Sequence, residues 1–209
     1  MRMCAIAVLA AVLLGGCGGV VSKAPASDDA TSRYDERLVG FWHADAVASG
    51  QGKPTPSQDE AILAFGRQEG ADRIFELIGV ELHPDKRLEL SRGEFTATTI
   101  DAKDYASLGL PLTDKAEAKE RSWGIVRYEM PDADTLIVVG MDEKAVAADV
   151  KAGTIAGATE SRAGSAVTEP TLVVTLSAST TVLRAYLEQR GDGAFATARP
   201  LVLRRLHLR

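Results

Sequence analysis

Cysteine, histidine and aromatic residues are all scarce in this sequence. Its 209 residues include two cysteines, Cys4 and Cys17, and three histidines. So few cysteines exclude the disulfide framework of many small secreted domains, and stability must come from an ordinary hydrophobic core. Aromatic residues make up 5% of the chain, which argues against a surface that binds carbohydrate or nucleic acid. The net charge of −5 also disfavours nucleic acid, whose phosphates attract clustered Lys and Arg.

Recognisable catalytic and metal-binding motifs are lacking as well. His43 with Asp45 and His83 with Asp85 repeat an i, i+2 spacing, which places both side chains of a pair on one face of a strand. Two such pairs brought together could bind zinc or act as acid and base, but no HExxH or similar motif supports them. Neither a Gly-x-Ser-x-Gly elbow nor a phosphate-binding glycine loop is present. We therefore predict a protein that is not an enzyme, with no metal and no cofactor.

The N-terminal apolar run is too short to cross a membrane. Ala5–Leu14 is an uncharged run of ten residues that follows Arg2, whereas a spanning helix needs about 20. The run has the length of the apolar region of a signal peptide. It ends in Leu14-Gly15-Gly16-Cys17, which resembles the lipobox of bacterial lipoproteins. The resemblance implies removal of residues 1–16 as a lipoprotein signal peptide and acylation of the Cys17 thiol with diacylglycerol.

Lipidation of Cys17 would place the protein in the cell envelope, with membrane lipid as its first partner. Two or more acyl chains give stable attachment to a bilayer. Gly18 occupies the sorting position of the lipoprotein family and is not Asp, so the resemblance implies the outer membrane, facing the periplasm. Residues 17–33 are small, polar and Pro-bearing, and we interpret them as the lipidated Cys and a flexible tether with a reach of about 20 Å. Residues 34–209 then form a single β-rich domain.

Short runs of β-branched and aromatic residues recur along the chain and predict an antiparallel sheet. The clearest hairpin pairs Trp123–Met130 with Thr135–Met141 through Pro131–Asp134, whose Pro and Asp are typical turn residues. Gly153–Pro170 is rich in small residues and predicts a loop around one weak strand. The other predicted strands are Val39–Asp45, Ala61–Phe65, Arg73–His83, Arg87–Leu90, Glu94–Ile100, Thr171–Leu176 and Leu201–Leu208.

Two segments predict helices. Asp142–Lys151 has acidic residues in its first turn and a lysine in its last, which complement the helix dipole. Ser179–Arg190 begins with a residue that caps helices and carries one apolar stripe. Ser57 and Glu60 have capping-box spacing, so a helix over residues 58–65 competes with the strand predicted there.

The first predicted strand resembles the opening strand of the lipocalins. Gly40-Phe41-Trp42 carries their Gly-x-Trp pattern, which implies that Trp42 plugs one end of a barrel. A basic residue near the last strand then packs across the Trp ring in a cation–π contact, and Arg204 or Arg205 is the candidate. The second lipocalin signature, Thr-Asp-Tyr, is absent. The expected fold is mainly β (α+β), an antiparallel, lipocalin-like curved sheet or partial barrel with about two helices.

The chain also resembles a set of bacterial lipoproteins of unknown activity over Trp123–Glu129, Leu172–Gln189 and Pro200–Leu206. That resemblance supports the fold more than any function. We expect a membrane-anchored envelope lipoprotein with a non-catalytic binding or accessory domain, whose partner is a protein or a small apolar ligand. Two alternatives stay open: an envelope hydrolase or metal-binding protein using His43 and His83, and a structural assembly accessory.

Overall fold

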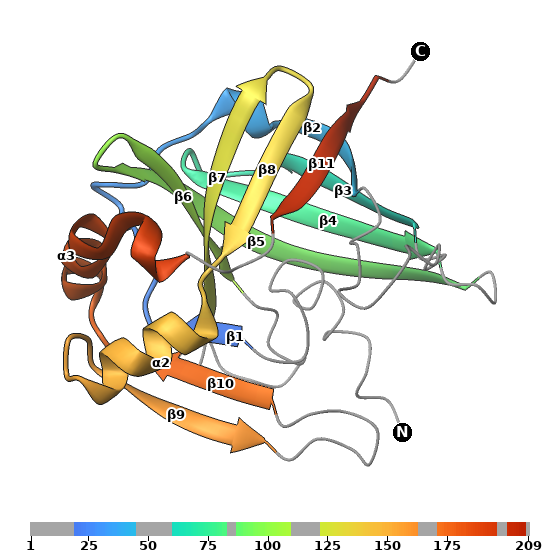
Figure 1. Cartoon of the computed structure of the whole chain (residues 1–209). Coiled ribbons are helices and arrows are strands. Elements are labelled where there is room, and N and C mark those ends of the chain that lie inside the picture. The colour runs from blue at the N-terminus through green and yellow to red at the C-terminus, as the bar shows by residue number, and fades with distance from the viewer. Residues whose placement is uncertain are drawn as a thin grey trace.

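A closed β barrel forms the main body of the molecule. The computed structural model describes residues 19–44, 60–82, 87–109, 122–162, 171–195 and 200–207. Eight antiparallel strands build the barrel (Figure 1). They are β2 (Gly40–Ala44), β3 (Glu60–Arg67), β4 (Ile74–Leu82), β5 (Leu88–Ile100), β6 (Lys103–Gly109), β7 (Trp123–Asp132), β8 (Thr135–Gly140) and β11 (Leu201–Leu206).

The barrel follows an up-and-down order. Each strand from β2 to β8 is antiparallel to the next, and β11 lies between β8 and β2 and closes the ring. This confirms the mainly β, antiparallel, lipocalin-like prediction, and the barrel is closed rather than partial. We call the barrel end that carries the 3-10 helix η1 (Glu36–Leu38) and the β5–β6 and β7–β8 turns the closed end.

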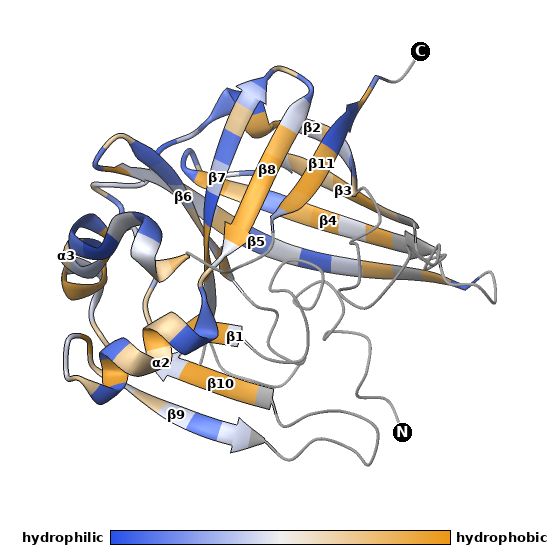
Figure 2. Cartoon of the chain, viewed as in Figure 1, coloured by the Kyte–Doolittle hydropathy of each residue, from blue (hydrophilic) through white to orange (hydrophobic). Residues whose placement is uncertain are grey.

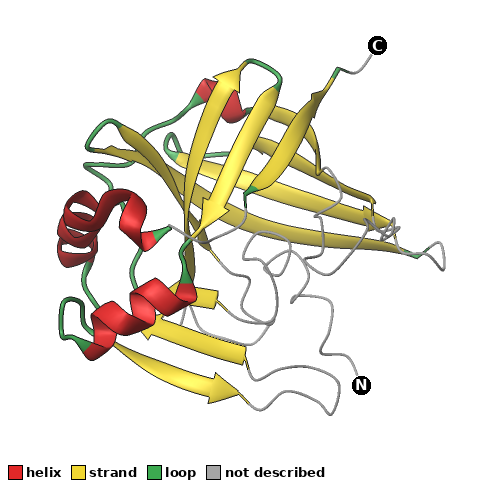
Figure 3. Cartoon of the chain, viewed as in Figure 1, coloured by secondary structure: helices red, strands yellow, loops and turns green. Residues whose placement is uncertain are grey.

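A smaller layer lies against one side of the barrel. It consists of β1 (Gly19–Ser22), β9 (Gly157–Arg162), β10 (Thr171–Leu176), the helices α2 (Glu143–Lys151) and α3 (Thr180–Arg190), and the 3-10 helix η3 (Gly191–Ala194). Strand β1 links this layer to the barrel, because it is parallel to β10 on one side and antiparallel to the start of β7 on the other. Both predicted helices are present, and Figure 3 shows them beside the barrel rather than within it.

The residues next to Cys17 do not form the flexible tether that the sequence predicted. Gly19–Ser22 is strand β1, and Val20 is buried in the core of the side layer. Further along, the backbone N–H of Ala26 donates to Ser107 Oγ at 2.8 Å, and the Ser27 and Thr96 hydroxyls lie 2.7 Å apart. The prediction was wrong because small polar residues are typical of flexible linkers, whereas these residues form hydrogen bonds with the barrel wall.

The molecule has two hydrophobic cores that share the barrel wall. The first core fills the barrel, and its larger members are Trp42, Phe65, Phe75, Phe95, Leu136 and Leu203. The second lies between the outer wall of β5–β8 and the helices, and it includes Ile100, Tyr105, Ile125, Val146, Leu183 and Leu187. Strands β5 to β8 are therefore buried on both faces over part of their length. Figure 2 shows the result for β8, which is largely hydrophobic.

The helix ends follow the sequence signals closely. The Asp142 carboxylate accepts from the backbone N–H groups of Lys144 and Ala145, and the Ser179 hydroxyl accepts from that of Val182. Gly191 ends α3 with a φ of 49°, in the left-handed region that favours glycine. Within the described residues, no helix is both long enough and apolar enough to span a membrane.

Most of the strand predictions were right, including the strand over Ala61–Phe65, and one strand was missed. Residues 60–67 form strand β3, so the alternative helix over 58–65 is wrong. Strand β6 was missed, because its hairpin turn is Asp101-Ala102, with φ of 47° and 59°. Both central residues of this turn type need positive φ, and the usual signal for it is Asn-Gly or Asp-Gly.

Candidate functional site

Of the two predicted histidine pairs, the structure describes only His43. Cys17, Asp45, His83 and Asp85 lie outside the described residues. His43 lies on β2, in register with Ile62 of β3 and Arg204 of β11. In the ranges that the structure covers, no group of three or more His, Cys, Asp or Glu side chains is arranged to hold a metal ion.

The expected contact between Trp42 and a basic residue of the last strand is present. The guanidinium of Arg205, not that of Arg204, lies 4.2 Å from the centre of the Trp42 ring. Arg205 also donates to the backbone carbonyls of Val39 at 2.7 Å, Arg37 at 2.5 Å and Ala133 at 2.7 Å. Arg205 therefore joins η1, β2 and the β7–β8 turn at the closed end.

The interior of the barrel is filled by side chains. Phe95 stacks on Phe75 with ring centres 4.4 Å apart, Phe65 meets Phe95 edge to face, and Tyr34 stacks on the other side of Phe75. Among the described residues, the cavity inside the barrel is about 30 Å³ and is lined by apolar surface, from residues such as Leu38, Leu77 and Val138. This volume is about a tenth of the smallest common ligand pocket. The few aromatic residues of the chain are thus concentrated where they fill the barrel.

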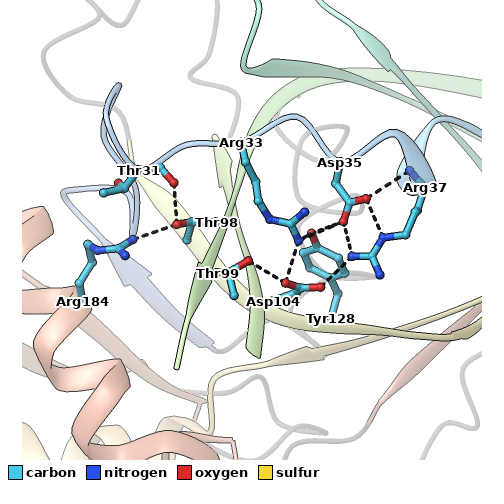
Figure 4. Close-up of polar contacts among 9 residues, drawn as sticks. All are labelled: Thr31, Arg33, Asp35, Arg37, Thr98, Thr99, Asp104, Tyr128 and Arg184. Carbon is cyan, nitrogen blue, oxygen red and sulfur yellow. Dashed lines mark hydrogen bonds and ion pairs between the residues drawn. The ribbon is translucent and has the colours of Figure 1, made fainter. Parts of the chain in front are cut away.

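A polar network closes the barrel beside Trp42 (Figure 4). We call Arg33, Asp35, Arg37, Asp104 and Tyr128 the closed-end network. The Asp35 carboxylate, 3% exposed, lies 2.6 Å from Arg37 Nη2 and 3.1 Å from Arg33 Nη2, and it accepts from the Tyr128 hydroxyl at 2.9 Å. Asp104 binds the same two guanidinium groups, at 2.7 Å from Arg33 and 2.9 Å from Arg37.

The network shifts the pKa values of Asp35 and Tyr128 in opposite directions. Burial raises the pKa of Asp35, but hydrogen bonds from Arg37 and Tyr128 and the charges of the two arginines outweigh this effect and hold the pKa of this carboxyl below its usual range. Burial raises the pKa of Tyr128, and the negative charge of Asp35 raises it further. At neutral pH Asp35 is therefore a carboxylate and Tyr128 a neutral phenol.

The chemistry of this network is that of a structural link between segments of the chain. Each carboxylate is paired with guanidinium groups. The Tyr128 hydroxyl donates a hydrogen bond to Asp35, and its raised pKa keeps the phenol protonated. A nucleophile paired with a general base is the usual arrangement for covalent catalysis, and the closed-end network contains no such pair. What it does is fasten residues 33–38 across β6 and β7.

A second link attaches the side layer to the same segment (Figure 4). Arg184 of α3 donates to the Thr98 hydroxyl at 2.9 Å and to the carbonyl of Ala26 at 3.0 Å. Thr98 in turn donates to the carbonyl of Thr31 at 2.9 Å. The chain before β2 is therefore held by both the barrel and the helices.

The outer wall of β2–β5 exposes large apolar side chains. Phe41, Ile78, Leu88, Leu90 and Leu206 are the large exposed hydrophobic side chains of the barrel. Strand register places them in adjacent rows. One row runs from Leu206 through Phe41, Ala64 and Ile78 to Arg92, and the next runs from Arg204 through His43, Ile62 and Val80 to Leu90. We call this surface the outer apolar face. The helices cover the wall of β5–β8, so the two sides of the barrel are not equivalent.

Comparisons with known proteins returned no significant match to a protein-family model, a curated protein or a solved structure. The lipocalin-like fold therefore rests on the barrel itself. Its support is the closed order of eight antiparallel strands and the stacking of Arg205 on Trp42.

Sequence reasoning missed the closed-end network entirely. Asp35 and Asp104 are 69 positions apart in the numbering and carry no local motif. One signal was available, because Arg33, Asp35 and Arg37 alternate just before the Gly-x-Trp strand. Alternation puts all three side chains on one face of an extended segment, and opposite charges on one face favour a paired cluster.

Proposed function

We propose that this chain is a lipid-anchored envelope protein whose barrel is a non-catalytic module that binds a protein partner on its outer surface. The observation that carries this proposal is the filled barrel. With a cavity of about 30 Å³, the interior leaves no room for a ligand of ordinary size. The outer apolar face, in contrast, exposes several large hydrophobic side chains. Uncovered apolar surface of this kind is typical of interaction sites.

The proposed anchor would hold the domain close to the membrane. Strand β1 begins at Gly19, two residues after Cys17. Two residues span at most about 7 Å, compared with the roughly 20 Å reach of a free tether of 15 residues. An acylated Cys17 would therefore keep β1 and its neighbours β7 and β10 near the lipid headgroups.

The position of β1 also favours a partner on the other side of the barrel. In the closed order of eight strands, β3 is four strands from β7 in either direction. The outer apolar face, centred on β3 and β4, thus lies across the barrel from the strand that pairs with β1. A small apolar ligand or a hydrolase has less support, because the barrel is filled and His43 is not joined by a second described histidine on its face.

Cys17→Ser tests the anchor in the full chain. We expect it to abolish labelling by a radioactive or clickable fatty acid and to leave unprocessed precursor in the cells. Cys4→Ser is the matched control, since the proposed cleavage removes Cys4, and it should label like the wild type. Undiminished labelling of Cys17→Ser would show that the thiol is not the attachment point.

A further inference from the structure

Strands β6 and β7 separate at the closed end of the barrel. Their last paired residues there are Asp104 and Tyr128. Beyond this pair, β7 continues to Asp132 beside β8, whereas β6 begins only one residue before Asp104, directly after the β5–β6 turn. Figure 1 shows the two strands diverging toward this end. The opening between them therefore follows from the strand register.

This opening holds a cleft of about 330 Å³. The volume is about eleven times that of the cavity inside the barrel, and it lies near the lower end of the range for small-molecule pockets. The strand connections at the closed end, residues 68–73, 101–102 and 133–134, all lie within the described part of the chain. The lining of the cleft includes Ala102, Lys103, Arg127, Glu129, Met130 and Pro131.

Lys103 and Arg127 are the two cations that line the cleft. Both pair with Asp192 of η3, with Lys103 Nζ at 3.1 Å from the carboxylate. The hydrogen bond from Lys103 lowers the pKa of Asp192, and the charges of both cations lower it further against the opposing effect of burial. The two cations therefore already stabilise one carboxylate beside the cleft.

Arg127 has donors that its pairing with Asp192 leaves unused. Its Nε is buried and has no hydrogen-bond partner among the described residues. Its Nη2 lies 3.6 Å from Glu129 Oε1, which is too long for a hydrogen bond. In a guanidinium, Nε and Nη2 lie on one planar edge, and such an edge binds both oxygens of a carboxylate. An acceptor with two oxygens that reached this edge from the cleft would satisfy both donors.

We propose that this cleft binds a small molecule that carries one carboxylate and a short apolar chain. The carboxylate accepts from the Nε and Nη2 edge of Arg127 and from Lys103, whose ammonium has three N–H donors. The apolar chain packs on Ala102, Met130 and Pro131. The site is separate from the outer apolar face, so the inference goes beyond the proposed function.

Charge balance favours a single carboxylate over a phosphate dianion or an amine. Lys103 and Arg127 carry two positive charges, and Asp192 and Glu129 place two negative charges beside them. Asp104, which also lines the cleft, is paired within the closed-end network. A second negative charge on the ligand would be repelled by these carboxylates, and an ammonium would be repelled by the two cations. Glu129, with its side chain 63% exposed, can turn toward solvent as one carboxylate enters.

The test titrates the purified full chain with hexanoate, hexanol, hexylammonium and inorganic phosphate, and follows the backbone amide signals by NMR. We expect hexanoate to give saturable shifts centred on residues 102–104 and 127–131, and the other three probes to give none there. Equal shifts with hexanol would reveal an apolar groove only. Equal or tighter binding of phosphate would reveal a non-selective anion site. Either result would overturn the proposal, as would an absence of shifts with hexanoate.

Lys103→Gln and Glu129→Gln should change the affinity for hexanoate in opposite directions. Loss of the Lys103 charge should weaken binding about fivefold, and loss of the Glu129 charge should strengthen it by a similar factor. The two side chains are 35% and 63% exposed, so both variants should keep the wild-type unfolding midpoint. Lys144→Gln, at an exposed position on α2, is the matched control and should bind like the wild type. Changes in the same direction, or an equal loss in the control, would show that these charges do not bind the carboxylate.

Discussion

At the scale of single residues, Arg205 shows how one side chain closes a barrel. Its guanidinium covers the Trp42 ring and donates to three backbone carbonyls, from η1, the residue before β2 and the β7–β8 turn. These carbonyls have few other donors at the end of a barrel, where strand pairing stops. A lysine side chain has one nitrogen, so it lacks the planar array of N–H donors with which arginine reaches all three carbonyls.

Arg205→Ala should therefore be clearly destabilising. Loss of the cation–π contact and of charge-assisted hydrogen bonds predicts a decrease of about 3 kcal/mol in the free energy of unfolding. Arg204→Ala is the matched control, because the Arg204 side chain is exposed on the outer side of the same strand and does not contact Trp42; even with the loss of its hydrogen bond to the Thr135 hydroxyl, it should cost about 1 kcal/mol. Urea denaturation of both variants measures the difference, and equal losses would contradict the assignment of Arg205 as the closing residue.

Asp35 predicts a pH dependence with a definite sign. Its pKa is lowered in the folded protein, so its stabilising contribution is present above the unfolded carboxyl pKa of about 3.9 and is lost as the pH falls through the folded value. Asp35→Asn should cost about 3 kcal/mol at pH 7, since it removes the buried carboxylate and leaves Asp104 as the carboxylate that Arg33 and Arg37 share. Denaturation at pH 7, 4 and 3 should show this cost shrinking toward acid. A constant difference, or a similar effect of the exposed Asp29→Asn, would refute the role of the charge.

At the scale of elements, β1 changes how the N-terminal region is understood. A segment of four residues between the proposed lipid site and the barrel is part of the sheet and not a spacer. Its parallel pairing with β10 places it in the second core, where Val20 contacts the cluster below the helices. The chain thus enters the fold almost at once after Cys17.

Val20→Ala should lower the free energy of unfolding. The same substitution in a flexible tether would have no such effect. Removing two methyl groups from a fully buried side chain costs about 2 kcal/mol, including the cavity left behind. Lys23→Ala, one residue past β1 and exposed, should change the unfolding free energy by less than about 0.5 kcal/mol. If thermal or urea unfolding gave the same midpoint for Val20→Ala and the wild type, β1 would not be part of the cooperative unit.

At the scale of the whole molecule, the barrel is a solid body with two unlike sides. One side is covered by α2, α3 and the strands of the side layer, and the other presents the outer apolar face. Interior volume, which determines whether a barrel carries a ligand, is taken up by stacked aromatic rings. Because the interior is filled, binding of a partner would depend on the outer surface of the barrel.

Phe95→Ala tests the filled interior. Removing the ring should cost about 4 kcal/mol and open an apolar cavity in the range that takes up benzene. Benzene should then raise the melting temperature of Phe95→Ala by several degrees and leave the wild type unchanged. Phe41→Ala removes an exposed ring on the outer wall, so it should gain no benzene site. Stabilisation of the wild type by benzene would show that its interior already holds a ligand-sized space.

Most of the fold was accessible from the sequence, and most of the site was not. The β7–β8 hairpin and the caps of α2 and α3 depend on residues within a few positions of one another, so local patterns predict them. Strand β6 failed because the Asp101-Ala102 turn lacks the usual glycine.

What the sequence alone determined is the set of local choices: a mainly antiparallel β chain, two capped helices and a Trp42 that needs a cationic neighbour. These follow from periodicity and residue chemistry over short distances. Tertiary structure alone decided that the barrel closes and is filled, that Arg33, Asp35 and Asp104 meet, and that Leu88 and Leu90 are exposed. The reason is physical, because closure, packing and exposure depend on contacts between residues far apart in the chain, which no short window of sequence contains.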